Sequence, residues 1–138
     1  MSAENVAVIK ALYDAFESGN MPGVLGRMSP DIVWNEAENF PYSDDNPYRG
    51  PEAIAAGVFA RCGSEWDCFA VAMNDLIDGG DRVVAIGRYS GAFKATSRSM
   101  NPQAVHVWTL KDGKVTAFQQ YIDTLDVARA TGEASMAG

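Results

Sequence analysis

The feature that most constrains the fold is a series of four segments in the second half of the chain. These segments, residues 66–77, 82–93, 104–110 and 114–122, are rich in Val, Ile, Phe, Trp and Tyr. Branched and aromatic residues fit the pleated, half-buried surface of a strand. The joints Asp78-Gly-Gly-Asp81 and Asp112-Gly113 are typical of tight hairpin turns. The pattern therefore predicts an antiparallel sheet.

Helical patterns flank this sheet. Apolar residues recur at helical spacing in the first segment of the chain, where they are Val6, Ile9, Tyr13 and Phe16. We expect a second, short helix over 20–28, a third over 51–63 with Pro51 in its first turn, and a short tail helix around 125–128. Helices that are separated along the chain from one antiparallel sheet predict an α+β fold.

One further strand is expected between the second and third helices. Ile32, Trp34, Glu36 and Glu38 alternate with their neighbours, so one face carries a tryptophan and two acids. The segment 39–49 that follows is rich in proline, aspartate and asparagine and holds three aromatic residues, among them Phe40. It is expected to be a loop that covers a pocket.

The 138 residues fit a single domain over 1–138. Three short helices cannot cover both faces of such a sheet. We therefore expect a curved sheet that wraps around the N-terminal helices as a cone-shaped α+β barrel. Its other face is left bare or paired with a second copy, which predicts a homodimer. The space between the sheet and the helices is the natural site for a small ligand.

Composition excludes several classes of partner. A net charge of −7 with 11 scattered basic residues argues against nucleic acid binding. No apolar run approaches the roughly 20 residues that a membrane span needs. Residues 1–5 lack the features of a signal peptide, which favours the cytoplasm. Cys62, Cys68 and one histidine match no zinc spacing, so neither a metal nor another cofactor is expected.

Three polar residues stand within apolar strands. Asp123 closes the run 114–122, Glu36 ends the early strand, and His106 lies in the middle of the third long segment. A carboxylate or an imidazole in such a setting needs a partner, a path to solvent or a chemical role. Their recurrence predicts a polar site inside an apolar pocket.

The order of elements and three motifs resemble the NTF2-like superfamily, and within it the SnoaL-like proteins related to polyketide cyclases and ketosteroid isomerases. The motifs are Leu12-Tyr-Asp-Ala-Phe-Glu-Ser-Gly-Asn20, Tyr48-Arg-Gly-Pro-Glu-Ala-Ile54, and Val107-Trp-Thr-Leu-Lys-Asp-Gly-Lys-Val115 followed by Tyr121-Ile-Asp123. The resemblance covers nearly the whole chain and implies the cone fold. Since this fold serves enzymes of several classes and plain binding modules, it leaves the function open.

The resemblance also implies roles for these polar residues. Asp123 falls where the cyclases and the limonene epoxide hydrolases keep a catalytic aspartate. Glu36 falls where the ketosteroid isomerases have their general base, and His106 where they keep a protonated aspartate. In those isomerases, the apolar surroundings keep that carboxylic acid neutral, so that it donates a hydrogen bond to the developing oxyanion.

Two departures narrow the possibilities. Leu12 stands where the isomerases have their oxyanion tyrosine, with Tyr13 one position away, which argues against steroid isomerisation. Gly87 and Tyr89 stand where the epoxide hydrolases have an arginine and an aspartate, which argues against that hydrolysis. An isomerase or cyclase-like proton transfer on a small apolar carbonyl compound remains. Its base is Asp123 or Glu36, and His106 donates to the enolate oxygen or orients Asp123.

Apolar walls are predicted from Trp34, Phe40, Tyr121 and Tyr13. Each candidate also has a structural interpretation. Asp123 can cap the tail helix, Glu36 and Glu38 can be solvated at the mouth of the cone, and His106 can be an ordinary core residue. The alternative function is a non-catalytic module of the same fold that binds a small ligand or only dimerises.

Overall fold

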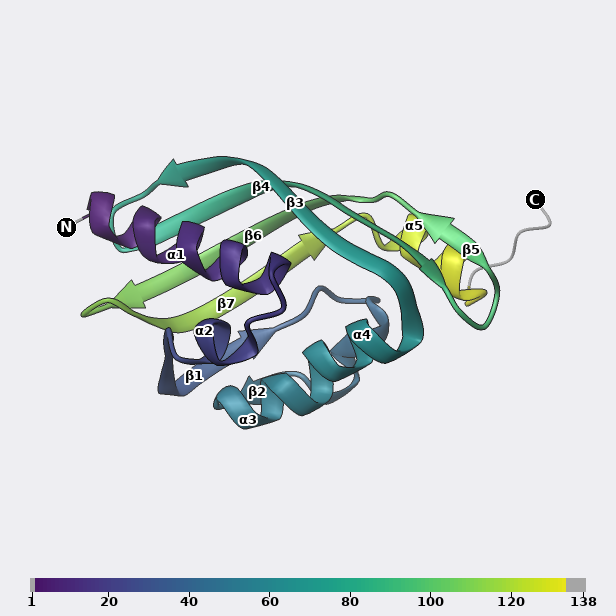
Figure 1. Cartoon of the computed structure of the whole chain (residues 1–138), viewed down its shortest axis with the longest axis horizontal. Coiled ribbons are helices and arrows are strands. Elements are labelled where there is room, and N and C mark those ends of the chain that lie inside the picture. The colour runs from purple at the N-terminus through teal and green to yellow at the C-terminus, as the bar shows by residue number, and fades with distance from the viewer. Residues whose placement is uncertain (1, 134–138) are drawn as a thin grey trace.

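The structure is a computed structural model that describes residues 2–133 (Figure 1). Its helices are α1 (Ser2–Glu17), α2 (Met21–Leu25), α3 (Pro51–Ile54), α4 (Ala60–Glu65) and α5 (Thr124–Thr131), with a 3-10 turn η1 (Pro41–Asp45) and a π-helical turn η2 (Ala55–Phe59) that joins α3 to α4. Its strands are β1 (Met28–Asn35), β2 (Tyr48–Arg49), β3 (Trp66–Asp78), β4 (Arg82–Phe93), β5 (Arg98–Met100), β6 (Gln103–Lys111) and β7 (Lys114–Ile122). The predicted α+β class is confirmed.

The strands form one mixed sheet of seven strands in the order β2-β1-β7-β6-β4-β3, with β5 paired to β4. All pairs are antiparallel except β1 with β7, which run parallel. The prediction of a purely antiparallel sheet is therefore wrong at this one pair. Hairpin turns set the direction of consecutive strands only, and β1 is separated from β7 by most of the chain. The sheet is curved but open, since its edge strands β2 and β3 do not pair with each other.

The long strands and their two hairpins agree with the predicted segments. The predicted helix over 20–28 is shorter, because it ends at Leu25 and Met28 already pairs with Val115 in the sheet. The expected loop over 39–49 contains η1 and the short strand β2. The third helix continues past Gly63 to Glu65 as α3, η2 and α4. The short strand β5 was not predicted, because its three residues carry no alternating pattern.

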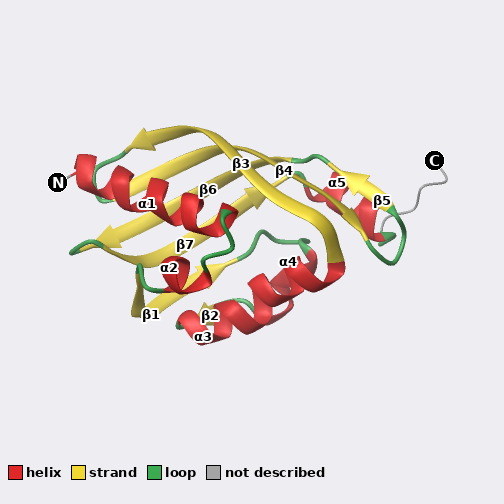
Figure 2. Cartoon of the chain, in the orientation of Figure 1, coloured by secondary structure: helices red, strands yellow, loops and turns green. Residues whose placement is uncertain are grey.

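Helices α1, α2 and α3–α4 lie on one side of the curved sheet (Figure 2). They bury Ile9, Val24 and Ile54 completely against inward-facing strand residues such as Val83 and Trp108. The strand residues alternate between this core and the outer face, as a period of two requires. On β6 the inward positions are Ala104, His106, Trp108 and Leu110, so the histidine points into the core.

Candidate functional site

An aromatic cavity lies between α1, η2 and the inner face of the sheet. Its volume is about 40 Å³, which holds a few water molecules. Its apolar lining includes Phe16, Trp34, Phe40, Phe59, Phe69, Trp108 and Phe118. The polar lining residues are Tyr13, Glu36, Tyr89, His106 and Gln120, together with the thiol of Cys62. A small set of polar groups inside an aromatic shell is typical of a site that binds small molecules.

The polar groups are concentrated because inward-facing side chains from three neighbouring strands meet at the cavity. His106 on β6 pairs with Gln120 on β7 and with Ala85 on β4. Tyr89 lies four residues after Ala85, on the same face of β4. Tyr13 reaches the same point from α1 across the cavity, so a helix and three strands contribute to one cluster.

Both ring nitrogens of His106 are engaged by tyrosine hydroxyls. Tyr13 Oη lies 2.6 Å from His106 Nδ1, and Tyr89 Oη lies 2.5 Å from His106 Nε2. The three rings are also in contact, since Tyr13 stacks on His106 at 5.9 Å and Tyr89 meets it edge to face at 5.6 Å. We call Tyr13, His106 and Tyr89 the Tyr–His–Tyr triad.

A fixed N–H donor holds each end of the triad. Trp108 Nε1 donates to Tyr13 Oη at 2.8 Å. Gln120 Nε2 donates to Tyr89 Oη at 2.8 Å, while Gln120 Oε1 accepts from the backbone N–H of Ala37 at 3.0 Å. Since a backbone N–H can only donate, this last bond fixes the orientation of the Gln120 amide.

The triad is shielded from solvent, and its ionisation reflects this. His106 is 4% exposed, and burial lowers the pKa of its imidazole to about 3. Burial raises the pKa of the Tyr13 and Tyr89 hydroxyls well above the ordinary value. At neutral pH the imidazole is therefore uncharged and both hydroxyls keep their protons.

Glu36 supplies a carboxyl group to the same cavity. Its side chain is 3% exposed, and Trp34 Nε1 donates to its Oε2 at 3.0 Å. Burial raises the pKa of Glu36 to about 8, although the Trp34 hydrogen bond and the charge of Arg61 both act to lower it. The carboxyl group is thus mostly protonated at neutral pH, and its pKa lies close to the range that suits acid–base chemistry.

The segment after β1 covers the cavity and is fastened from both sides. Asn46 exchanges two hydrogen bonds with the backbone of Glu36, at 3.0 and 2.8 Å. Asp44 binds Arg61 on α4 through two oxygens, at 2.9 and 2.8 Å. Phe40 is thereby held over the cavity at 2% exposure, which agrees with the predicted covering role of this segment.

Five of the predicted site residues line this cavity, namely Glu36, His106, Trp34, Phe40 and Tyr13. Asp123 and Tyr121 do not. Asp123 is exposed and caps α5, where its side chain accepts from the backbone N–H of Asp126 at 3.4 Å. Tyr121 is 57% exposed because it faces outward from β7, one position after the inward-facing Gln120. The expected grouping of Asp123 with His106 is therefore corrected, and its capping alternative is what the structure shows.

Tyr89 and Gln120 are two polar residues of the cavity that the sequence analysis did not predict as site residues. Both were detectable in part, since Tyr89 continues the inward alternation of Val83 and Ala85. Gln120 likewise follows Phe118 at a spacing of two. The strand register that places Gln120 opposite His106, and the packing that brings the Tyr89 hydroxyl to its ring, are tertiary properties.

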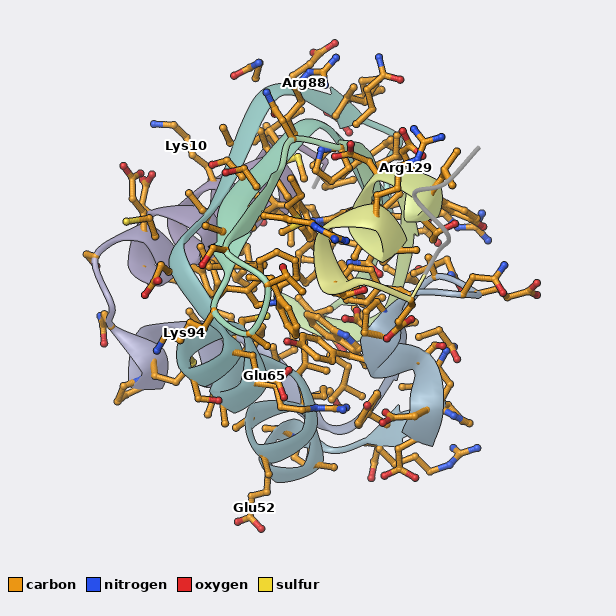
Figure 3. All side chains as sticks on the ribbon, turned by 90° about the vertical axis from the view of Figure 1, so that its right-hand side faces the viewer. Lys10, Glu52, Glu65, Arg88, Lys94 and Arg129 are labelled. Atoms are coloured by element: carbon orange, nitrogen blue, oxygen red, sulfur yellow. The ribbon has the colours of Figure 1, made fainter. Side chains whose placement is uncertain are left out.

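The remaining charged residues lie away from the cavity. Figure 3 shows Lys10, Glu52 and Arg88 at the periphery, directed away from the interior. Arg88 Nη1 donates to the carbonyl of Asn101 at 2.7 Å, and Glu38 is exposed. Within residues 2–133, no group of three His, Cys, Asp or Glu side chains is placed to hold a metal ion. The helices of the same range include none that is long and apolar enough to cross a membrane.

Comparison with known proteins supports this architecture. The family model of the SnoaL-like domain matches residues 9–118. No curated protein sequence matches the chain at a significant level. The crystal structure of an NTF2-like protein from Burkholderia thailandensis is 34% identical, with a TM-score of 0.88 over 92% of this chain and 96% of that one.

Two further solved structures are similar over nearly their full length. An NTF2-like protein from Burkholderia xenovorans is 30% identical, with a TM-score of 0.81 over 94% of this chain and 96% of that chain. TerC, co-crystallised with polyporic acid, is 26% identical, with a TM-score of 0.82 over 94% and 98% of the two chains.

Proposed function

Because the chain belongs to the SnoaL-like family of the NTF2-like superfamily, we propose that it is an isomerase- or cyclase-like enzyme that transfers protons on an apolar carbonyl compound. The observation that carries this proposal is the buried carboxyl of Glu36, with its pKa raised to about 8, in one aromatic cavity with the Tyr–His–Tyr triad. This arrangement provides a group that exchanges protons and a second group that donates a hydrogen bond.

Glu36 is the proton-exchanging group in this proposal. With its pKa near 8, about a tenth of the molecules carry the carboxylate at pH 7, and the rest carry the acid. The carboxylate removes a proton from the carbon beside the carbonyl, and the resulting acid returns it to another carbon. The Trp34 hydrogen bond holds the carboxyl group in place during both steps.

The triad acts on the carbonyl oxygen in this proposal. Removing a proton beside a carbonyl places negative charge on its oxygen, and a donor fixed in a dry site stabilises that charge. Tyr13 and Tyr89 line the cavity, and their hydroxyls remain protonated. A tyrosine hydroxyl of the triad therefore serves as the donor, and its high pKa disfavours full transfer of its own proton.

A bound molecule needs more room than the cavity now offers. Phe16, Phe69 and Val71 line both the cavity and a neighbouring surface hollow of about 250 Å³. Phe16 and Phe69 are only partly buried, with ring centroids 6.4 Å apart. We place the entrance here, so that rotation of these two rings joins the hollow to the cavity.

The alternative is a non-catalytic module that binds a small ligand, and the small cavity volume favours it. Side chains fill most of the space that a substrate would occupy. The crystal structure of TerC with polyporic acid is compatible with both functions, because co-crystallisation reports binding and not turnover.

Deuterium exchange on an enolisable ketone separates the two functions without knowledge of the natural substrate. Acetophenone is incubated with the protein in heavy water, and loss of its methyl proton signal is followed by NMR. The enzyme hypothesis predicts exchange above the buffer rate, which Glu36→Gln reduces by about a hundredfold or more. The exposed Glu38→Gln is the matched control and should leave the rate unchanged. Binding of acetophenone with exchange at the buffer rate would favour the binding module.

We propose in addition that the outer face of the sheet pairs with a second copy of the chain. Apolar residues are adjacent there across four strands, namely Ile77, Val84, Ile86, Val105, Val107 and Tyr121. Ile86 is 39% exposed near the centre of this patch.

Sedimentation should show a dimer that Ile86→Lys converts to a monomer, whereas Glu52→Lys on the helical side leaves it intact. A wild-type monomer at high concentration would contradict the proposal.

A further inference from the structure

The hydrogen-bond chain through the triad can be resolved into donors and acceptors. Trp108 can only donate to Tyr13 Oη, and Gln120 Nε2 can only donate to Tyr89 Oη because its amide orientation is fixed by Ala37. Both outer bonds therefore point inward, toward the triad. What remains open is the position of the protons between each hydroxyl and His106.

The number of these protons is fixed by the charge of the imidazole. His106 is 4% exposed, and the hydrogen bonds of its two nitrogens go to tyrosine hydroxyls and not to a carboxylate that would stabilise a positive charge. A buried imidazole without such a partner is neutral and carries one N–H. The triad then holds three protons, one on His106 and one on each tyrosine. Its two internal hydrogen bonds use two of them, so one hydroxyl proton is left over.

We propose that His106 is a positioning residue whose tautomer selects which of Tyr13 and Tyr89 presents this surplus O–H to an acceptor oxygen of the bound molecule. If Nδ1 carries the proton, it donates to Tyr13 Oη and Tyr89 donates to Nε2, so the Tyr13 O–H is free. If Nε2 carries the proton, the roles reverse and the Tyr89 O–H is free.

The role of the free hydroxyl in a reaction rests on the proposed function, whereas the tautomer of His106 can be tested independently of that function. It narrows the ligand to a compound with a neutral acceptor oxygen, such as an aldehyde or a ketone. The free hydroxyl is also the only donor that the triad can spare, because the fixed donors Trp108 and Gln120 are already committed to the tyrosines. A charged His106 would free both hydroxyls at once.

Nitrogen-15 NMR of the single histidine tests the inference on the protein without ligand. A protonated and an unprotonated ring nitrogen differ strongly in chemical shift, and long-range couplings to the ring protons distinguish Nδ1 from Nε2. The wild type should show one N–H nitrogen and one bare nitrogen, unchanged from about pH 5 to about pH 8. Since His106 is the only histidine in the chain, no assignment is required.

Two matched variants should lock opposite tautomers. Tyr13→Phe removes the partner of Nδ1, and a buried N–H without an acceptor is avoided more strongly than a bare nitrogen. The proton should therefore move to Nε2, where Tyr89 Oη accepts it. Tyr89→Phe should place the proton on Nδ1 for the converse reason. Each variant loses one tyrosine hydroxyl and leaves one N–H donor without its acceptor, namely Trp108 Nε1 in Tyr13→Phe and Gln120 Nε2 in Tyr89→Phe. Because these losses are equivalent, each variant is a control for the other. The same tautomer in both variants, or a wild-type imidazole that charges near its ordinary pKa, would overturn the inference.

Infrared spectroscopy of bound benzaldehyde measures the presented hydroxyl directly. Benzaldehyde has no proton on carbon beside its carbonyl, so it reports hydrogen bonding without the proposed reaction. Its carbonyl stretch should shift to lower frequency in the wild type and in each single variant, because each of these proteins keeps one free tyrosine hydroxyl. A stretch that stays at the frequency of benzaldehyde in an apolar solvent in all three proteins would overturn the inference. Failure of benzaldehyde to bind would instead count against the proposed function, and the NMR result would still decide on the tautomer.

Discussion

Replacing Glu36 by glutamine should stabilise the protein increasingly as the pH rises. Burial raises the pKa of Glu36 from 4.5 to about 8. Between these two values the unfolded chain releases its proton while the native protein retains it. The free energy of unfolding therefore falls as pH rises through this window. The slope is about 1.4 kcal/mol per pH unit, so the full effect approaches about 5 kcal/mol above pH 8.

The difference between the wild type and Glu36→Gln isolates this effect. His106 has its pKa lowered to about 3, so its contribution to stability is present above pH 6.5 and is lost as the pH falls toward 3. That contribution is the same in both proteins and cancels in the difference. Between about pH 5 and about pH 8 the variant should gain about 3.5 kcal/mol relative to the wild type. Urea denaturation at several pH values, followed by tryptophan fluorescence, measures both curves.

The outcome at low pH serves as an internal check. Near pH 5 both side chains are neutral, and a glutamine oxygen can still accept from Trp34 Nε1, so the two stabilities should differ by only about 1 kcal/mol. The exposed Glu38→Gln should show no such pH dependence. Parallel curves for the wild type and Glu36→Gln would mean that Glu36 is solvated. A difference of opposite sign would mean that the charge of Arg61 outweighs burial.

Two further predictions concern the scaffold. Asp123→Ala should lower the free energy of unfolding by about 0.5–2 kcal/mol through loss of the α5 cap, while acetophenone exchange remains within about twofold of the wild type. A large loss of exchange at unchanged stability would return Asp123 to the site. Gly57→Ala should cost about 1–3 kcal/mol, because the added Cβ would lie 2.3 Å from the Tyr48 ring. Gly63→Ala in the adjoining α4, where the added Cβ would have no atom within 4 Å, should instead stabilise by up to about 1 kcal/mol, and thermal denaturation compares the two.

The parts of the fold that follow from local chemistry were predictable from sequence. The hairpins at 78–81 and 112–113 and the alternating strands around them depend on turn residues and on a period of two. The parallel pairing of β1 with β7 was not predictable, because it joins segments that no hairpin connects. The π-helical turn η2 was not predicted for a different reason, because its residues have an ordinary helical composition.

The functional site was likewise predictable from the sequence only in part. Glu36 and His106 were identified because a polar residue stood in an apolar strand, and Asp123 was selected by the same argument. The sequence pattern at Asp123 could not distinguish a carboxylate that points into the cavity from one that caps a helix. An aspartate at the end of a strand and directly before a helix fits both interpretations. The partners of His106 depend on sheet register and on the packing of α1, which brings Tyr13 to the imidazole. The sequence therefore identified Glu36 and His106 as cavity residues, but not the contacts of His106 with Tyr13 and Tyr89.

The polar groups of the cavity are mostly uncharged, and this affects which ligands the cavity can bind. At neutral pH, Glu36 is mostly the acid, His106 is neutral, and Tyr13 and Tyr89 are protonated. A ligand with a full charge would meet no mostly ionised side chain among the residues that line the cavity, and desolvating it would be costly. A neutral carbonyl compound avoids that cost on entry. In the reaction that we propose, Glu36 removes a proton from this compound, and the new charge on oxygen forms beside the hydroxyl that we infer His106 to orient. Such a site strengthens binding of the charged state more than binding of the ground state, and this difference is what accelerates a reaction.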